Sequence, residues 1–132
     1  SLCKLLTQIP NVQLAMFSIL EPGGIITPHC GPSKGALRYH LGLQCPKDND
    51  AEIVVDGVPY CWKDGEGVLF DDTYMHHVKN RSKDTTRIIL FCDIIRKMNT
   101  ETRTNINNYI LKTLGPTINK VNNRQEKLHK NQ

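Results

Sequence analysis

The sequence has no long run of apolar residues, and this absence excludes a transmembrane segment. Its apolar runs are short, as from Ile88 to Phe91, whereas a helix that spans a bilayer needs roughly 20 apolar residues. The chain of 132 residues also begins at Ser1 without an initiator Met or a charged-then-apolar leader. We therefore expect a processed protein or an excised domain, and a membrane anchor upstream of Ser1 is compatible with the sequence.

Paired cysteines are missing as well. The five cysteines are odd in number, and no two of them form a Cys-x-x-Cys pair, which argues against a disulfide framework and against a structural zinc site. The chain has no internal repeat, no low-complexity tract and no nucleic-acid-binding motif. We expect a reducing, cytoplasmic compartment and no nucleic-acid partner.

An excess of basic charge is absent from most of the chain. Residues 1–95 carry nine Lys or Arg and eleven Asp or Glu, a net charge of −2, whereas residues 96–132 carry eight and two, a net charge of +6. The overall charge of +4 therefore belongs to the C-terminal end. We expect the basic residues of this tail to be solvated, and peripheral contact with an anionic membrane is the alternative.

Short strands separated by turn residues dominate the first hundred residues. In Ala36 to Leu43, apolar residues alternate with Arg38, His40 and Gly42, which is typical of a β-strand and places Arg38 and His40 on one face. Asp56-Gly57 is the dipeptide that type I′ hairpin turns prefer. Strands are predicted at Val12 to Leu20, Ile25 to His29, Ala36 to Leu43, Ile53 to Val55, Val58 to Trp62, Val68 to Phe70 and Thr85 to Ile94. This pattern predicts a mainly β protein, an antiparallel sandwich or barrel.

Helical periodicity is confined to the two ends of the chain. Ser1 to Ile9 has apolar residues at helical spacing and is ended by Pro10. Near the C-terminus, one predicted helical face carries Ile106, Tyr109, Ile110 and Leu114, and a second helix follows the break at Gly115-Pro116. We expect the apolar face of these helices to pack against the β domain.

Histidine and arginine residues in the β region are candidates for chemistry. Four of the five histidines lie there: His29, His40, His76 and His77. In a closed barrel, inward His and Arg side chains would be costly without a metal or an anion to satisfy them. Arg38 and His40 on one strand, with Arg87 on the last strand, would suit a dicarboxylic acid, because a guanidinium grips a carboxylate with two charge-assisted hydrogen bonds.

Five segments together resemble a known family. They are Phe17-Ser18-Ile19, Pro28-His29-Cys30-Gly31-Pro32, Leu37-Arg38-Tyr39-His40-Leu41-Gly42-Leu43, Phe70-Asp71-Asp72-Thr73-Tyr74-Met75-His76 and Arg87-Ile88-Ile89. In order and spacing, the chain from Ser18 to Asp93 resembles the aspartyl/asparaginyl β-hydroxylases, a family of Fe(II)- and 2-oxoglutarate-dependent dioxygenases. The resemblance implies a double-stranded β-helix, or cupin-like jelly roll, over residues 1–98. Residues 99–132 would form a basic helical appendage that packs on this domain or extends from it.

The resemblance also implies a set of site residues. His29 and His76 would bind the iron, and His77 ranks behind His76 because neighbouring strand residues point in opposite directions. Ser18 and Arg87 would hold the distal carboxylate of 2-oxoglutarate, while Arg38 and His40 would hold the end that chelates the metal. No catalytic residue is expected beyond the metal site. Molecular oxygen would be the other cosubstrate.

Gly31 stands where many non-haem iron oxygenases have a carboxylate ligand. Chemistry alone would count this glycine against an oxygenase, but the resembled family shares it, with water in the vacant position. Asp71, Asp72 and Asp93 are alternative ligands, although turn capping by the Asp pair and a strand-end role for Asp93 explain them more simply. Cys30 is a weaker candidate ligand.

The substrate is left open by the sequence. Animal peptide hydroxylases of the resembled family have an Arg that contacts the acidic substrate where this chain has Ala36. A peptide Asp or Asn side chain is therefore in doubt, and a lipid acyl chain or another small molecule is the alternative. A cupin-like module that binds metal and 2-oxoglutarate without catalysis is a further alternative. Tyr60 and Trp62 are expected to pack in the core or on a sheet face.

Overall fold

The computed structural model describes residues 2–113, apart from the side chain of Cys3. These residues belong to two compact units, of which the first ends at Arg96 and the second begins at Lys97. The first unit contains a short helix and eight strands, and it carries every predicted site residue. Its elements are α1 (Leu2–Gln8), β1 (Val12–Leu20), β2 (Ile25–His29), β3 (Ala36–Gln44), β4 (Ala51–Val55), β5 (Val58–Cys61), β6 (Gly67–Phe70), β7 (His76–Asn80) and β8 (Arg87–Ile95).

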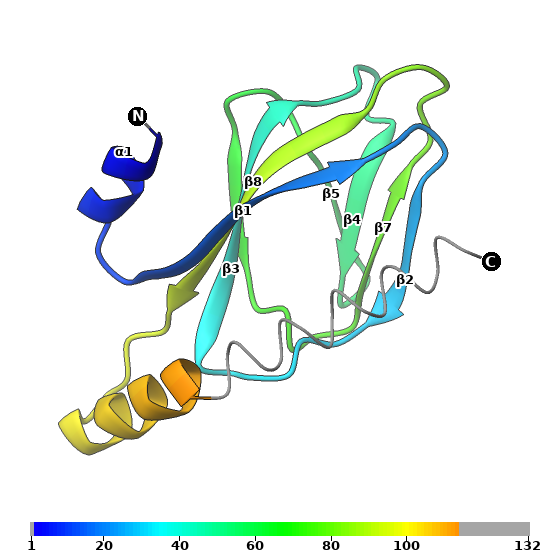
Figure 1. Cartoon of the computed structure of the whole chain (residues 1–132). Helices are drawn as coiled ribbons and strands as arrows, with labels where there is room; N and C mark the ends of the chain where they lie inside the picture. Colours follow the sequence, from blue (N-terminus) through cyan, green and yellow to red (C-terminus); the bar gives the residue numbers. More distant parts are fainter. Residues whose placement is uncertain (1, 114–132) are drawn as a thin grey trace. The chain divides into compact units, whose positions relative to one another are not determined.

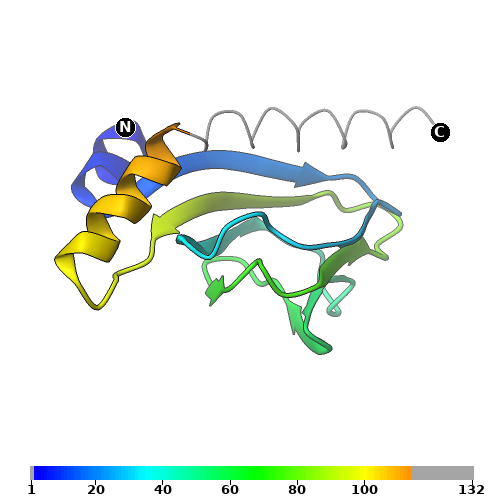
Figure 2. The ribbon, with the colours of Figure 1, turned by 90° about the horizontal axis from the view of Figure 1, so that it is seen from below.

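The strands form two antiparallel sheets of four strands each. Sheet A has the order β1-β8-β3-β6 and sheet B the order β2-β7-β4-β5. Figure 1 shows β1, β8 and β3 on one side of this unit and β4, β7 and β2 on the other, and Figure 2 shows the long strands β1 and β8 side by side. The predicted mainly β, jelly-roll fold is confirmed, together with its short N-terminal helix.

The core lies between the two sheets. Ile53 of β4, Val78 of β7 and Ile89 of β8 are buried, and Trp62 closes the same cluster from the residue after β5. Trp62 is therefore a core residue, as the sequence predicted. The inward residues of each strand alternate with outward ones, because successive side chains in a strand point to opposite faces.

The hairpin between β4 and β5 has the geometry that its sequence predicts. Asp56 and Gly57 both have positive φ, at 49° and 79°, as a type I′ turn requires. The turn sets the register in which Val55 pairs with Val58 and Val54 with Pro59. This register decides which side chains of β5 face the interior.

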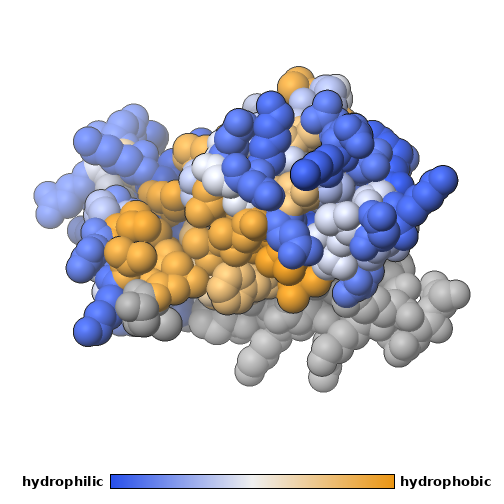
Figure 3. All heavy atoms as spheres, turned by 90° about the horizontal axis from the view of Figure 1, so that it is seen from above, coloured by the Kyte–Doolittle hydropathy of each residue, from blue (hydrophilic) through white to orange (hydrophobic). Residues whose placement is uncertain are grey.

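The outward face of sheet A is apolar and partly exposed. Phe17 and Ile19 of β1, Leu43 of β3 and Leu69 of β6 are all exposed. Seen from above, the space-filling view shows the hydrophobic surface gathered in one part of the molecule rather than scattered (Figure 3).

Residues 101–113 form a helix in the region where the sequence predicts the first C-terminal helix. Thr100 caps it, since its side-chain oxygen accepts a hydrogen bond of 3.2 Å from the backbone N–H of Arg103. In this helix Ile106, Tyr109 and Ile110 are exposed, and Asn107 and Leu111 are buried. Packing of its apolar face on the β domain stays a prediction. The predicted break at Gly115-Pro116 and the second helix lie outside the described residues.

Within residues 2–113, no helix is both long enough and apolar enough to span a bilayer.

Candidate functional site

His29 and His76 lie side by side at one end of sheet B. His29 is the last residue of β2, His76 is the first of β7, and the two are paired across the strands. Their ring centroids are 4.2 Å apart. The register of β2 and β7 thus brings together two residues that are about half of this unit apart in the sequence.

Both imidazoles are held in the same tautomer. Nδ1 of His29 lies 2.7 Å from the carbonyl oxygen of Thr27, and Nδ1 of His76 lies 2.8 Å from that of Tyr74. A carbonyl oxygen only accepts, so each Nδ1 must carry the proton and donate it. When such an imidazole is neutral, its lone pair is on Nε2, which is the form that binds a metal.

Burial favours the uncharged form of His76. Desolvation is the main cause that lowers the pKa of His76 below its usual value, and His29 and Arg38 nearby lower it further. The neighbouring His77 pairs with Val54 and, as the next residue along β7, points to the opposite face of sheet B. The structure therefore sets His76, and not His77, beside His29.

Arg38 is held by two carboxylates of the protein. Its Nη2 lies 3.1 Å from Asp72 and 3.1 Å from Asp93, and its Nε donates a 3.1 Å hydrogen bond to Asp93. The guanidinium also lies over the ring of Phe91, 4.2 Å from its centroid. The ion pairs of Arg38 with Asp72 and Asp93 were not predicted from the sequence. Binding of 2-oxoglutarate by Arg38 stays a prediction.

Asp71 and Asp72 are neighbours in the sequence but have different roles. Asp71 caps the turn, as expected, by accepting hydrogen bonds from Thr73, and it also pairs with Arg96. Asp72 does not cap the turn but is buried against Arg38. Burial raises the pKa of Asp72 and of Asp93, although Arg38 acts to lower both.

The carboxylate of Asp72 fills the space beside Gly31. The backbone N–H of Gly31 donates a 2.6 Å hydrogen bond to the carbonyl oxygen of Asp72. A Cβ atom on residue 31 would overlap the Asp72 carboxylate. Position 31 therefore requires glycine for packing reasons, independently of any ligand.

His40 lies inside the barrel, between the sheets. It is 5% exposed and surrounded by the rings of Phe70, Phe91 and Trp62, with centroids 4.9, 5.3 and 5.8 Å away. Neither ring nitrogen has a hydrogen-bond partner within the described part of the chain. Burial lowers the pKa of His40 well below its usual value, with further lowering by Arg87 and Arg38. A buried imidazole with unmet hydrogen-bonding capacity fits a polar ligand in this space.

Ser18 and Arg87 contact each other across the pair β1 and β8. Arg87 is 1% exposed, and its Nη2 donates a 3.2 Å hydrogen bond to the hydroxyl of Ser18. The guanidinium also lies 4.7 Å from the ring centroid of Trp62. All six predicted site residues thus belong to one connected group, because His40 interacts electrostatically with Arg38, Arg87 and His76, and the latter two contact Ser18 and His29 respectively.

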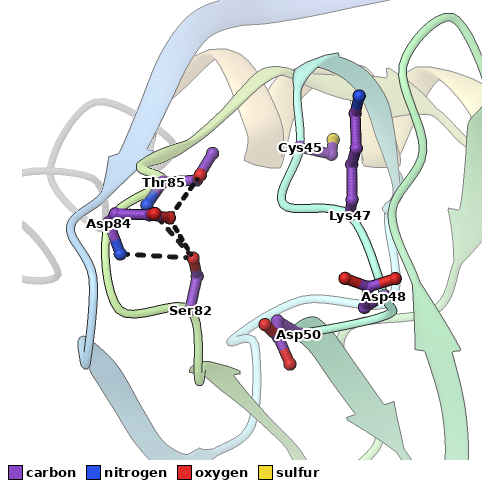
Figure 4. Close-up of a pocket in the computed structure, with 7 residues that line it drawn as sticks. All are labelled: Cys45, Lys47, Asp48, Asp50, Ser82, Asp84 and Thr85. Atoms are coloured by element: carbon purple, nitrogen blue, oxygen red, sulfur yellow. Dashed lines mark hydrogen bonds between the residues drawn. The ribbon is translucent and has the colours of Figure 1, made fainter.

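A depression of about 220 Å³ lies at the opposite end of sheet B from the two histidines (Figure 4). It is formed where β3 and β7 end and where β4 and β8 begin. Its lining residues are Cys45, Lys47, Asp48, Asp50, Ser82, Asp84 and Thr85. None of the predicted site residues is among them.

The histidine pair does not belong to a larger cluster of metal-ligating side chains in the described part of the chain. Among residues 2–113, no group of three or more His, Cys, Asp or Glu side chains is placed to hold a metal ion. Cys30, beside His29, is an exposed free thiol. The fold and the site together define a cupin-like jelly roll with a histidine pair at one end of sheet B and the buried side chains of His40 and Arg87 in its interior.

Comparison with known proteins identifies the family. Residues 1–97 match the family model described as aspartyl/asparaginyl beta-hydroxylase, so the chain belongs to that family. It is 42% identical over 97 residues to the ornithine lipid ester-linked acyl 2-hydroxylase of Rhizobium tropici, covering 73% of this chain and 34% of that protein. It is 40% identical over 82 residues to aspartate beta-hydroxylase domain-containing protein 2 of Mus musculus, covering 61% of this chain and 23% of that protein. The chain thus spans about a third or less of these two curated relatives.

Solved structures support the fold. A Cupin_2 domain of an XRE family transcriptional regulator from Enterobacter cloacae superposes with a TM-score of 0.52 at 17% identity, covering 63% of this chain and 81% of that one. A predicted oxalate decarboxylase from Thermotoga maritima gives a TM-score of 0.52 at 19% identity, covering 65% and 69%. At these identities the likeness extends to the cupin fold alone.

Proposed function

We propose that this chain is an Fe(II)- and 2-oxoglutarate-dependent dioxygenase that hydroxylates a C–H bond. The observation that carries the proposal is the pairing of His29 with His76, with both Nδ1 protons donated to backbone carbonyls and both Nε2 lone pairs left for a metal. Membership in the aspartyl/asparaginyl β-hydroxylase family supports the reaction class.

The groups around the histidines suit a divalent cation. Asp72 and Asp93 share the single guanidinium of Arg38, which leaves an excess of carboxylate in this cluster. The charge of Asp72 reaches His29, so this carboxylate would attract a cation held at His29. His29 and His76 would hold the iron, and Gly31 contributes no protein ligand.

The interior of the barrel suits the two ends of 2-oxoglutarate. Ser18 and the buried Arg87 would hold the distal carboxylate, and His40, with Arg38, would hold the end nearer the metal. When bound, iron and 2-oxoglutarate together convert molecular oxygen into an oxidant that inserts one oxygen atom into a C–H bond, with succinate and carbon dioxide as coproducts. The rings of Phe70, Phe91 and Trp62 around His40 exclude water from this region.

The printed names of the relatives supply two candidate substrates. One relative is named as a hydroxylase of a lipid acyl chain, and others are named as aspartate β-hydroxylase domain-containing proteins. We propose that the substrate of this chain is one of these two kinds.

Succinate release from 2-oxoglutarate with added Fe(II) tests the proposal. We expect turnover by the wild type and its loss to background in His29→Ala and His76→Ala, because each variant removes one of the two protein ligands. The matched control is His77→Ala, whose side chain lies on the other face of sheet B and should leave turnover unchanged. Equal turnover in the wild type and His76→Ala would contradict the assignment.

A non-catalytic module that binds metal and 2-oxoglutarate is the second candidate. It is favoured by the absence, among residues 2–113, of a third protein side chain placed on the metal. Anaerobic titration measures the binding of Fe(II) and 2-oxoglutarate, and a turnover assay with oxygen then separates the two candidates. Binding of Fe(II) and 2-oxoglutarate without succinate release, in the presence of oxygen and candidate substrates, would support the module and contradict the enzyme.

A further inference from the structure

The place of Trp62 in the core accounts for its ring but not for its N–H group. The side chain is 1% exposed and belongs to the core cluster between the sheets. Its indole Nε1 is buried and has no hydrogen-bond partner among the described residues. Buried indole N–H groups usually have a partner, because an unpaired donor has lost its hydrogen bonds to water without gaining another. This donor therefore requires an explanation beyond packing.

The ring of Trp62 lies against the residues that are proposed to bind 2-oxoglutarate. The guanidinium carbon of Arg87 is 4.7 Å from the centroid of this ring, and Nη2 of the same guanidinium donates to the hydroxyl of Ser18. The His40 ring is 5.8 Å away and tilted by 33°. A guanidinium over the face of an indole leaves its N–H available at the ring edge, because that bond lies in the plane of the ring.

The groups beside the Trp62 ring favour an anion as the partner of its N–H. An indole N–H and a guanidinium are hydrogen-bond donors only, so the group that pairs with Trp62 must be an acceptor. Besides burial, the groups that lower the pKa of the adjacent His40 are Arg87, Arg38 and His76, which are guanidinium and imidazole groups. A carboxylate suits this surrounding, because its oxygens only accept hydrogen bonds and its charge is opposite to that of Arg87.

We infer that the indole N–H of Trp62 donates a further hydrogen bond to the carboxylate that Ser18 and Arg87 would hold. This inference rests on the proposed function, in which that carboxylate is the distal end of 2-oxoglutarate. Trp62 then helps to select a dicarboxylic acid, since a 2-oxo acid with a methyl group at the distal end offers the N–H no acceptor.

Removal of the donor without a change in ring size tests the inference. At position 62, 3-benzothienylalanine keeps the fused ring and has sulfur in place of the N–H. We expect the Zn(II)-loaded full chain with this analogue to bind 2-oxoglutarate about tenfold more weakly than the wild type, the effect of one hydrogen bond to a charged acceptor. Binding of 2-oxovalerate, in which a methyl group replaces the distal carboxylate, should be the same in both proteins. Isothermal titration calorimetry measures both affinities without turnover.

The matched control is Tyr60→Phe. The Tyr60 hydroxyl is also buried without a hydrogen-bond partner among the described residues. After burial, Glu66 and Cys45 raise the pKa of Tyr60 most, which places the hydroxyl beside these two groups. Its removal should leave the affinity for 2-oxoglutarate unchanged, and thermal unfolding verifies that both altered proteins fold. An equal loss of affinity in Tyr60→Phe would assign the effect to the loss of any buried polar group and overturn the inference.

The indole N–H can also be observed directly by NMR. Trp62 is the only tryptophan of the chain, so the protein gives a single indole N–H signal. We expect 2-oxoglutarate to move this proton signal downfield, as a hydrogen bond to a carboxylate does, and 2-oxovalerate to leave it in place. A signal that 2-oxoglutarate binding does not move would show that the donor has another acceptor, such as a buried water molecule, and would overturn the inference.

The binding data separate failure of this inference from failure of the proposed function. Equal affinity of the wild type and the analogue for 2-oxoglutarate would overturn the role of Trp62 and leave the proposed cosubstrate in place. Weaker binding of 2-oxoglutarate and 2-oxovalerate by the same factor would indicate a packing effect and overturn that role as well. A wild-type protein that binds no 2-oxoglutarate would contradict the proposed function, and the inference with it.

Discussion

The carboxylate of Asp72 fills the space that a side chain at position 31 would need, where this protein has Gly31. We expect Gly31→Ala to be destabilising by roughly 1–3 kcal/mol, the usual cost of overpacking a filled site, because its Cβ would overlap that carboxylate. Since Asp72 also holds Arg38 and Gly31 lies two residues from His29, metal affinity should fall as well. Urea unfolding and metal titration measure the two effects.

A double variant provides the control for this prediction. Asp72→Ala removes the carboxylate that the new methyl group would meet, so the combined variant should be more stable than the sum of the two single changes predicts. Strict additivity would show that the cost at position 31 has another cause, such as its backbone.

At the scale of single residues, the sequence predicted the site only in part. The resemblance named His29, His40 and Arg87, and the structure places all three around one interior. The partners of Arg38 were missed because Asp72 and Asp93 lie 34 and 55 residues further along the chain. A contact of this kind depends on strand order and register, which no local pattern of residue types contains.

At the scale of elements, the proposed metal site depends on the pairing of β2 with β7. β2 is an edge strand of sheet B with mostly exposed residues, so it should open more easily than the central strands. A metal bound by one histidine from each strand would hold the two together. At a concentration of 100 times its Kd, such a ligand adds about 2.7 kcal/mol to the stability of the state that binds it.

Hydrogen exchange can follow this effect strand by strand. We expect Zn(II) to slow exchange of the backbone amides of β2 and β7 in the wild type and in His77→Ala, and to have no effect in His29→Ala. Slowing that persists in His29→Ala would show that the metal binds elsewhere.

The strands were predicted from local patterns with one exception. Seven of the observed strands match predicted segments closely, as at Val12–Leu20 and Ile25–His29. The missed strand is β7, His76–Asn80, because its inward positions include His76 and Asn80 rather than apolar residues alone. Asn80 is buried since its side-chain amide donates to three backbone carbonyls, those of Leu20, Glu21 and Thr85. Such a role cannot be recognised from hydrophobic periodicity.

At the scale of the whole molecule, stability should depend on the protonation of His40. Its pKa is lowered well below 6.5 in the folded state by burial, Arg87 and Arg38. Below about pH 6.5 the unfolded chain therefore takes up a proton that the folded protein excludes. This contribution to stability is present above pH 6.5 and is lost as the pH falls toward the folded pKa, with a slope of up to about 1.4 kcal/mol per pH unit.

Unfolding by urea at pH 7.5 and at pH 5.5 measures this dependence. His40→Phe should lose less stability between these two values than the wild type, because a phenyl ring suits the surrounding Phe70, Phe91 and Trp62 and carries no proton. An identical loss in both proteins would assign the pH dependence to other groups, among them His76.

The net charge of +4 conceals two different parts of the chain. The residues that form both sheets are slightly acidic, and the positive charge follows after β8. Contact of the basic tail with an anionic membrane therefore stays a prediction separate from the site, whose own cations, Arg38 and Arg87, are inward.

The Gly31–Asp72 arrangement also constrains how this protein can evolve. A single substitution that placed an aspartate or glutamate at position 31 would not add a protein ligand, because Asp72 already occupies the space that its side chain would need. Adding one requires Asp72 to change as well, and that change would take one carboxylate from Arg38. Positions 31 and 72 are thus coupled by epistasis: each of the two changes is unfavourable until the other has been made.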